Sequence, residues 1–379
     1  MRCRLLFGFL ALAACGDDLP PGRIVDAVKC ATDPSQSYAL FVPSNYSPNR
    51  NWSVIFALDP AARGRVPVER YQAAAEKYGY IVAGSNTSRN GSMAASLAAV
   101  QAMVEDVSKR FAVDSKRVYL TGLSGGARVA MQVAMMSGSQ IAGVIASSAG
   151  FPNGESRKSV PFAIFTTAGI EDFNYLEMRV LDGAVTSPHR LAIFEGGHAW
   201  PPSETAVEAV EWMEVQAMKT GRRTRDEALI NAIFMRRRQQ AEAQSSGLSL
   251  CVALEALAAD FDGLRDGTAF AARAAELRRQ KSIKDALKKD RAEEQREDRM
   301  VTELLDLELG LADPATRSNN LAQLRGRLAS LTKQSNAAED SADRRMARRV
   351  LRGTFARSRE LMNDAEYQKL LGDMRARLN

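Results

Sequence analysis

The clearest candidate for chemistry is a serine inside a glycine-rich pentapeptide. Residues 122–126 read Gly-Leu-Ser-Gly-Gly, which fits the pattern Gly-x-Ser-x-Gly around Ser124. A β-branched and aromatic run precedes this stretch and an alanine-rich helical pattern follows it, so we expect Ser124 at a sharp strand-to-helix turn. Glycines relieve the crowding at such a turn, and the serine hydroxyl is held out above the sheet edge. The N–H of Gly125, at the start of the new helix, could then stabilise an oxyanion.

A nucleophilic serine needs a base, and the chain has two histidines. His198 follows the apolar run "RLAIFEGG", whereas His189 stands at its start. In a parallel sheet, catalytic groups gather beyond the carboxyl ends of the strands. We therefore predict His198 as the general base and a structural role for His189.

The third catalytic group is expected after the strand that lies between Ser124 and His198. The segment "FAIFTTAGIEDFNY" ends its strand-like run at about Thr167 and then places Glu171 and Asp172 in a loop. An acid there would orient the imidazole and stabilise the imidazolium. We favour Asp172 because its shorter side chain suits that role, and Asp182 falls on a helical pattern.

Two kinds of pattern divide the chain. Over residues 22–219, short apolar runs such as "SVIFALD" alternate with helical patterns, which predicts an α/β domain with a mostly parallel sheet flanked by helices. Over residues 222–379 no strand-like run remains and the apolar spacing is helical throughout, so an all-α domain of helical hairpins is expected. These hairpins are loosely similar to tetratricopeptide-type repeats, although they show no clean period.

Residues 22–219 resemble the α/β-hydrolase superfamily, near the feruloyl esterase and polyhydroxyalkanoate depolymerase-like secreted esterases. The motifs "GLSGG", "AGIEDFN" and "GGHAWP" carry this resemblance, and the order Ser124, Asp172, His198 agrees with it. The resemblance implies an eight-stranded sheet and hydrolysis of small-molecule or polymer carboxylic esters without a cofactor. The sequence contains no metal-ligand cluster, Walker loop or dinucleotide fingerprint, so neither cofactor nor metal is expected.

The chain departs from the pattern of the family that it resembles after the third expected strand, where many members have His-Gly and this sequence reads "LDPAARG". Proline has no N–H to donate, so Ala61 is predicted as the second oxyanion donor. The loop "SNTSRNG" at residues 85–91 should reach the site, although it also fits a plain Asn-Gly turn. Asn86 in this loop and Trp200 beside His198 are predicted to contact the substrate.

The first residues have the anatomy of a targeting segment. Two arginines precede an apolar stretch at residues 5–14 that is too short to span a bilayer. "LAAC", which ends at Cys15, resembles the bacterial lipoprotein signal, so residues 1–15 are predicted as a signal segment and Cys15 as the lipidated mature N-terminus. A simple secretory signal is the alternative. Either reading predicts a protein of the bacterial cell envelope, and the first adds a lipid anchor to a membrane.

Two further cysteines remain in the expected mature chain, Cys30 and Cys251. An oxidising compartment would permit a disulfide between them. Two separate buried thiols are the alternative, because spacing alone does not supply the geometry that a disulfide requires.

The net charge of +6 resides in the helical part, which from Arg222 onward holds 31 Lys and Arg against 25 Asp and Glu. The signs are interspersed and no nucleic-acid motif accompanies them, so a solvated helical surface is expected, with no nucleic-acid partner. Such an array could instead bind a protein partner. Three functions stay open: an esterase, a peptidase of the same fold, or an inactive surface binding protein. Because all three triad candidates and both oxyanion donors precede Lys219, the chemistry is expected not to need the helical part.

Overall fold

The computed structural model describes residues 19–155, 157–244, 247–361 and 364–378. Cys15 and the predicted signal segment lie outside these ranges, so lipidation stays a prediction.

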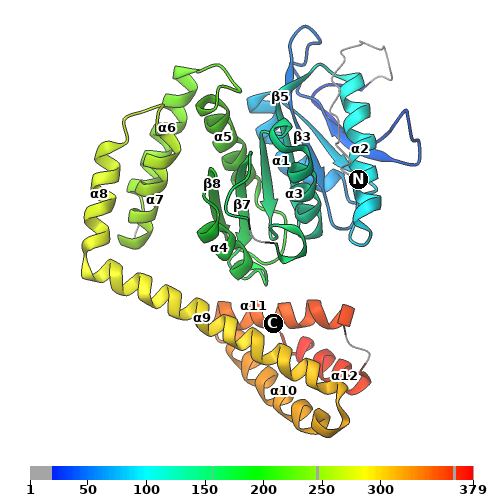
Figure 1. Cartoon of the computed structure of the whole chain (residues 1–379), viewed down its shortest axis with the longest axis vertical. Helices are drawn as coiled ribbons and strands as arrows, with labels where there is room; N and C mark the ends of the chain where they lie inside the picture. The colour runs from blue at the N-terminus through cyan, green and yellow to red at the C-terminus, as the bar shows by residue number, and fades with distance from the viewer. Residues whose placement is uncertain (1–18, 156, 245–246, 362–363, 379) are drawn as a thin grey trace. The chain divides into compact units, whose positions relative to one another are not determined.

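Eight strands form one sheet in the order β1-β2-β4-β3-β5-β6-β7-β8 (Figure 1). Strands β1 and β2 and strands β2 and β4 pair antiparallel, whereas β4, β3, β5, β6 and β7 pair in parallel along the sheet. The strands are β1 (Ile24–Lys29), β2 (Ser37–Phe41), β3 (Trp52–Leu58), β4 (Tyr80–Ser85), β5 (Val113–Leu123), β6 (Gly143–Ser147), β7 (Ala163–Gly169) and β8 (His189–Phe194).

Helices alternate with the parallel strands and then continue alone. Those of the sheet region are α1 (Arg65–Tyr78), α2 (Met93–Arg110), α3 (Gly125–Ser137), α4 (Tyr175–Ala184) and α5 (Ser203–Lys219). Those that follow are α6 (Glu227–Glu242), α7 (Gly247–Phe261), α8 (Thr268–Arg279), α9 (Lys281–Leu309), α10 (Pro314–Ser335), α11 (Ala342–Leu361) and α12 (Ala365–Arg375). The predicted fold class, a mostly parallel sheet with flanking helices followed by a helical region, is confirmed.

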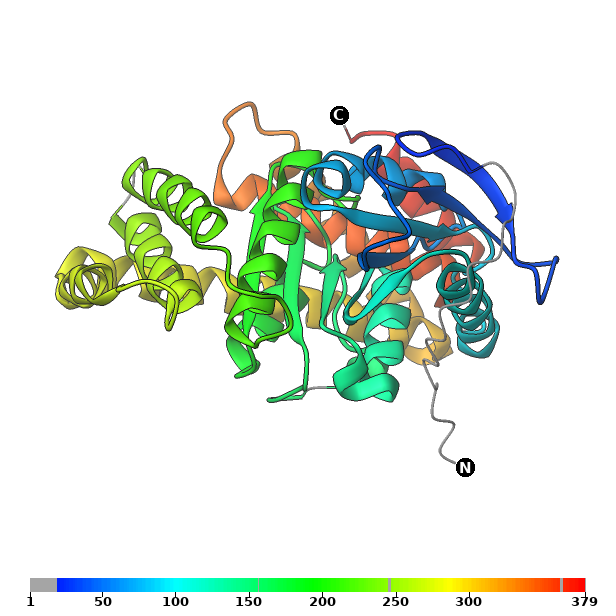
Figure 2. The same ribbon diagram turned by 90° about the horizontal axis from the view of Figure 1, so that it is seen from above.

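The alternation of side chains along each strand explains why helices cover both faces of the sheet (Figure 2). Phe56 of β3 belongs to the hydrophobic cluster that α2 and α3 complete, whereas its neighbour Ile55 belongs to the cluster of α1 and α5. Every residue of β3 is buried. A strand covered on both faces reads as a continuous apolar run, which is what residues 53–59 showed.

The helix boundaries in the second half follow capping chemistry. Helix α10 begins where Asp313 accepts a hydrogen bond from the N–H of Ala315 at 2.9 Å, with Pro314 in the first turn. An Asp cap followed by Pro starts a helix because the proline lacks an N–H that would otherwise be unpaired. Asp313 and Pro314 therefore mark the point at which α10 begins after α9.

The chain divides into two compact units. The first contains the sheet, α1 to α3, most of α4, and α5 to α8, over residues 1–168, 177–194 and 199–278. The second contains α9 to α12 together with two short loops from the sheet region, residues 169–176 and 195–198. Whether the segments 22–219 and 222–379 fold as independent domains stays a prediction.

Cys30 and Cys251 are both free and buried. Cys30 lies in the cluster under α2 and α3, and Cys251 packs with Leu254 and Ala274 among α6 to α8. The disulfide considered from the sequence is therefore not formed, because each thiol is enclosed in a separate hydrophobic cluster.

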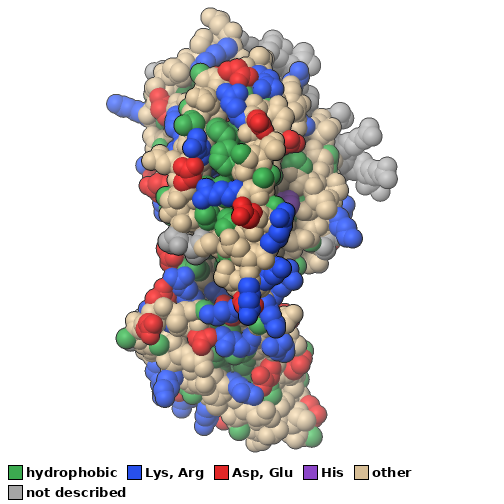
Figure 3. Space-filling view, turned by 90° about the vertical axis from the view of Figure 1, so that its left-hand side faces the viewer, with side chains coloured by type: hydrophobic (Ala, Val, Ile, Leu, Met, Phe, Trp, Pro, Cys, Tyr) green, Lys and Arg blue, Asp and Glu red, His purple; other side chains and the backbone are tan. Residues whose placement is uncertain are grey.

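Basic and acidic side chains lie interspersed on the face that Figure 3 shows. Many of the second unit's arginines pair with carboxylates of neighbouring helices, as Arg327 does with Glu303 at 2.6 Å.

Within the described ranges, no helix combines the length and apolarity that a bilayer crossing requires.

Candidate active site

Ser124 stands at the junction of β5 and α3 in a backbone conformation that side chains rarely adopt. Its φ is 53° and its ψ is −122°, and its N–H donates to the Ser147 carbonyl at 2.8 Å. A residue other than glycine pays a strain cost at positive φ, and such strain gathers at functional positions. This is the geometry expected of a nucleophile at a strand-to-helix turn.

The glycines around Ser124 are required by close backbone contacts. A Cβ at Gly122 would clash with the backbone of Gly126, and a Cβ at Gly126 would clash with the carbonyl oxygen of Leu58 in β3. The third glycine, Gly125, lies under the side chain of Asn90. The turn is therefore tight enough to press α3 against β5 and β3, and side chains are absent where there is no room for them.

Asp172 and His198 are hydrogen-bonded to each other. The Nδ1 of His198 lies 2.8 Å from Asp172 Oδ1. The Asp172 side chain is fully buried, while a fifth of the His198 side chain is exposed. Among the described residues no donor reaches Asp172 Oδ2, whereas the N–H of Asn174 donates to Oδ1 at 2.9 Å. A buried carboxylate bonded to Nδ1 leaves Nε2 as the nitrogen that can exchange protons.

The two loops that carry this pair are tied together through their backbones. Glu171 donates its N–H to the Gly196 carbonyl at 2.8 Å. A Cβ at Gly169, the last residue of β7, would clash with the carbonyl oxygens of Gly196 and Gly197. Phe173 stacks on the His198 ring with centroids 4.0 Å apart. The acid loop and the base loop therefore behave as one packed element.

The other titratable candidates have different partners. The Glu171 carboxylate binds Arg348 and Arg352 rather than a histidine. His189, at the start of β8, has its Nδ1 2.8 Å from the Ser187 carbonyl and its Nε2 3.7 Å from Asp182. The geometry thus selects Asp172 as the partner of His198, as its loop position suggested.

The predicted oxyanion donor Ala61 is engaged elsewhere. Its N–H donates to Asp59 Oδ1 at 2.9 Å, because the turn after β3 folds back onto this buried carboxylate. Arg63 also binds Asp59, through a contact of 2.9 Å from its Nε. The prediction that the Ala61 N–H is free to face an oxyanion is therefore wrong for this conformation.

Asp59 also determines the position of Trp200. The indole Nε1 donates to Asp59 Oδ2 at 2.8 Å, and only 6% of Trp200 is exposed. Burial alone would raise the pKa of Asp59, but hydrogen bonds from Arg63, Trp200 and Ala61 outweigh it and hold this pKa below its ordinary value. Trp200 is consequently a core residue and not the substrate contact predicted from its place beside His198.

Asn86 is likewise a structural residue. Its amide donates to the Asp26 carbonyl of β1 at 2.9 Å and lies 3.4 Å from the Ser37 hydroxyl of β2. The residue of the same loop that reaches the Ser124 turn is Asn90, whose N–H donates to the Pro60 carbonyl at 2.9 Å and whose side chain lies against Gly125. The two asparagines looked equivalent in the sequence, and only the loop's path distinguishes them.

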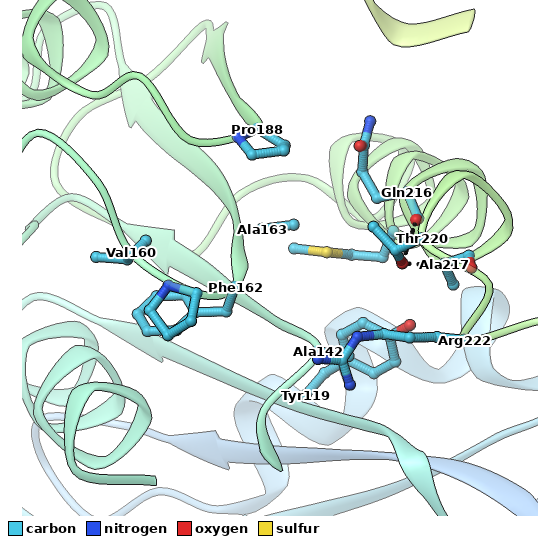
Figure 4. A pocket seen from close by; sticks show the side chains of 12 residues that line it. Tyr119, Ala142, Val160, Phe162, Ala163, Pro188, Gln216, Ala217, Thr220 and Arg222 are labelled. Atoms are coloured by element: carbon cyan, nitrogen blue, oxygen red, sulfur yellow. Dashed lines mark hydrogen bonds between the residues drawn. The ribbon is translucent and has the colours of Figure 1, made fainter. Parts of the chain in front are cut away.

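A pocket of about 350 Å³ lies elsewhere in the first unit (Figure 4). It is lined mainly by apolar side chains, with Ala142 before β6, Ala163 at the start of β7 and Pro188 before β8. These are the amino ends of the strands, whereas Ser124 follows a carboxyl end, so the pocket is not part of the candidate site. In the described ranges, no three His, Cys, Asp or Glu side chains are grouped to hold a metal ion.

No protein-family model and no curated protein matches the chain. Similar solved structures include the S-formylglutathione hydrolase of Staphylococcus aureus, at 14% identity, with 52% of this chain and 99% of that one covered and a TM-score of 0.41. The S954A feruloyl esterase module of Clostridium thermocellum is 14% identical, with coverages of 53% and 92% and a TM-score of 0.40. Thermogutta terrifontis esterase 2 is 13% identical, with 55% of this chain and 98% of that one covered and a TM-score of 0.39. These neighbours are hydrolases and esterases, and each spans about half of this chain.

Proposed function

We propose that this protein is a serine hydrolase that cleaves carboxylic esters through an acyl-enzyme. The observation that carries the proposal is the Ser124 turn, with its positive φ and its two glycines that backbone contacts require. A serine held in this way has a hydroxyl presented for attack and a helix N-terminus beside it. Strained backbone of this kind clusters at functional positions, and at Ser124 it coincides with the Gly-x-Ser-x-Gly turn.

In this proposal Asp172 and His198 complete a triad with Ser124. Their loops follow β7 and β8, and β5 and β7 belong to the same parallel part of the sheet, whose carboxyl ends form one edge. His198 takes the proton of Ser124 as the hydroxyl attacks the ester carbonyl, then returns it to the leaving alcohol. Water resolves the acyl-enzyme with His198 again as base.

The oxyanion of the tetrahedral intermediate would be bound by the Gly125 N–H. Gly125 is the first residue of α3, and the first N–H groups of a helix have no intrahelical acceptor. Asn90 replaces Ala61 as the candidate for the second donor: its side chain lies against Gly125 with the accepting Oδ1 nearest, and the Nδ2 of the same amide group would donate after the amide turns over. Each such donor typically contributes about 3 kcal/mol to lowering the barrier.

A fluorophosphonate probe tests the proposal. Labelling followed by peptide mapping should find the adduct on Ser124, and Ser124→Ala should abolish both labelling and ester hydrolysis. A panel of short and long acyl esters, aryl esters and peptides then identifies the substrate class. Cleavage of peptides in preference to esters would establish the peptidase alternative. A folded protein without labelling or turnover would refute the hydrolase and favour the inactive binding protein, which a binding experiment would then have to demonstrate.

We also propose that Cys15 is lipidated and anchors the protein in the bacterial cell envelope. The support is the sequence "LAAC" after a short apolar region. Cys15→Ser should move the protein out of the membrane fraction or stall its processing, as followed by fractionation and mass spectrometry. Mature protein with an unmodified Cys15 in the soluble fraction would contradict the anchor.

A further inference from the structure

Four arginines of α11 lie on one face of that helix. Arg345, Arg348, Arg349 and Arg352 are spaced i, i+3, i+4 and i+7, a spacing that aligns side chains along a helix. The second unit contains both this helix and the loops 169–176 and 195–198 that carry Asp172 and His198.

Three of these arginines bind the acid loop directly. Arg348 Nη1 lies 2.6 Å from Glu171 Oε1, and Arg352 Nη1 lies 3.0 Å from Glu171 Oε2. Arg349 Nη1 donates to the carbonyl of Ile170 at 2.8 Å. Side chains of one helix therefore hold a carboxylate and a backbone carbonyl in the two residues that precede Asp172.

Arg349 is itself held in place by other parts of the second unit. Its Nε donates to Glu297 of α9 at 2.8 Å, and its guanidinium lies 4.5 Å from the centre of the Tyr175 ring. The side chains of Arg349 and Glu297 are 11% and 5% exposed. A charge pair this buried keeps a defined geometry, because separating the partners would leave a buried charge uncompensated.

The base loop touches the same helix. A Cβ at Gly197 would lie 2.7 Å from Arg352 Nη1, so glycine leaves room for this guanidinium beside His198. Arg345 Nη2 lies 3.8 Å from the Glu195 carboxylate. In the acid loop, Phe173 lies against Gly353 of α11, where an added Cβ would be 3.4 Å from the Phe173 Cβ, and its ring stacks on the His198 ring. Helix α11 therefore contacts both loops through charge and through packing.

We propose that Arg348, Arg349 and Arg352 are positioning residues for the catalytic acid and base, so that the C-terminal helices form part of the active site's framework. The expected effect of these arginines on turnover rests on the proposed hydrolase function. That they hold the two loops in place does not depend on that function. It replaces the expectation that the chemistry does not need the helical part. The arginines take no part in proton transfer: they hold the loop in which Asp172 orients His198.

The test compares full-length variants at two readouts. Arg348→Ala combined with Arg352→Ala should lower kcat on a small activated ester by about 10²-fold, because small misplacements of catalytic groups cost this much, with little change in KM. Amide hydrogen exchange in residues 169–176 and 195–198 should become faster. Arg348→Lys, made with Arg352 intact, keeps a positive charge beside the Glu171 carboxylate and should therefore retain most of the wild-type kcat. Arg327→Ala removes a comparable arginine of the same unit that pairs with Glu303 and touches neither loop, and it should change neither readout.

A folded double variant with wild-type kcat and wild-type exchange in both loops would overturn the proposal. If the double variant does not fold, Arg352→Ala alone decides the matter, since this side chain is 41% exposed. If the wild-type protein hydrolyses no ester, the proposed function fails, and the exchange comparison still decides whether α11 holds the two loops.

Discussion

Phe173 stacks on the imidazole of His198, with ring centroids 4.0 Å apart and ring planes inclined by 23°. Phe173 follows Asp172 in the chain, so two adjacent residues hold one histidine, the first by a hydrogen bond and the second by its ring face. Such a ring restricts the tilt of the imidazole, which the hydrogen bond alone does not.

Phe173→Leu should therefore lower kcat without preventing folding. An aromatic pair is worth about 0.5–1.5 kcal/mol beyond its buried area, which corresponds to a loss of up to about tenfold in rate. Steady-state kinetics with an activated ester measures it. Phe234→Leu is the matched control, since it removes an edge contact with Phe261 in the helical part of the first unit and should lower Tm but not kcat. Equal losses of kcat in both variants would count against a special role for the stack.

The two histidines should differ sharply on substitution. His198→Ala is expected to lower kcat by at least about 10²-fold, the usual contribution of a general base. His189→Ala should stay close to wild type, because His189 contacts a backbone carbonyl and Asp182 at the opposite end of β8. Comparable losses in the two variants would refute the assignment of His198 as base.

Asn90→Ala should lower kcat by about 10²-fold with little change in KM, as loss of one oxyanion donor does. Asn86→Ala serves as its control, because Asn86 lies in the same loop but binds Asp26 of β1. We expect Asn86→Ala to reduce Tm and leave kcat nearly unchanged. A larger kcat effect from Asn86 than from Asn90 would reverse our interpretation of the loop.

Gly126→Ala should destabilise the protein by about 2 kcal/mol or more, because the added Cβ meets the Leu58 carbonyl in a packed interior. Gly183→Ala, in α4, meets no atom within 4 Å and should raise the free energy of unfolding by up to about 1 kcal/mol. Urea denaturation measures both. If Gly126→Ala were as stable as wild type, the close approach of α3 to β3 would be wrong.

The thiol of Cys30 should be unreactive in the folded protein. Burial, with the charges of Asp106 and Asp33 adding to it, raises its pKa to about 11 from an ordinary value of 9.0. Between these two pH values the unfolded chain loses the Cys30 proton while the folded protein keeps it. The contribution of the protonated, buried thiol to the free energy of unfolding is therefore full below pH 9.0 and is lost as the pH rises through about 11.

Titration with a thiol reagent checks this in a protein carrying Cys3→Ser and Cys15→Ser. At pH 8 we expect no rapid labelling of Cys30 or Cys251 until denaturant is added, and then two thiols. Burial also raises the pKa of Cys251. Absence of thiols after denaturation without reductant would mean that the pair is oxidised, contrary to the structure.

The sequence by itself determined the features that depend on near neighbours. Alternation of buried runs with helical patterns predicted the sheet, and glycines on both sides of Ser124 predicted the tight turn. Both follow from local chain geometry, since a strand buried on two faces must be apolar and a sharp turn excludes side chains. The positions of Asp172 and His198 after expected strands also placed them in loops that the structure brings within hydrogen-bond distance.

Tertiary structure decided everything that depends on a distant partner. The indole of Trp200 donates to Asp59, 141 residues away, which removes Trp200 from its predicted role, whereas the N–H of Ala61 meets the same carboxylate only two residues away. Arg348 of α11 binds Glu171 across 177 residues of chain, and Arg349 and Arg352 also bind this loop. Their spacing on one helix face was visible in the sequence, but spacing reveals only which side chains lie together and not what they meet. A hydrogen bond or an ion pair requires the positions of both partners, and only the folded chain supplies them.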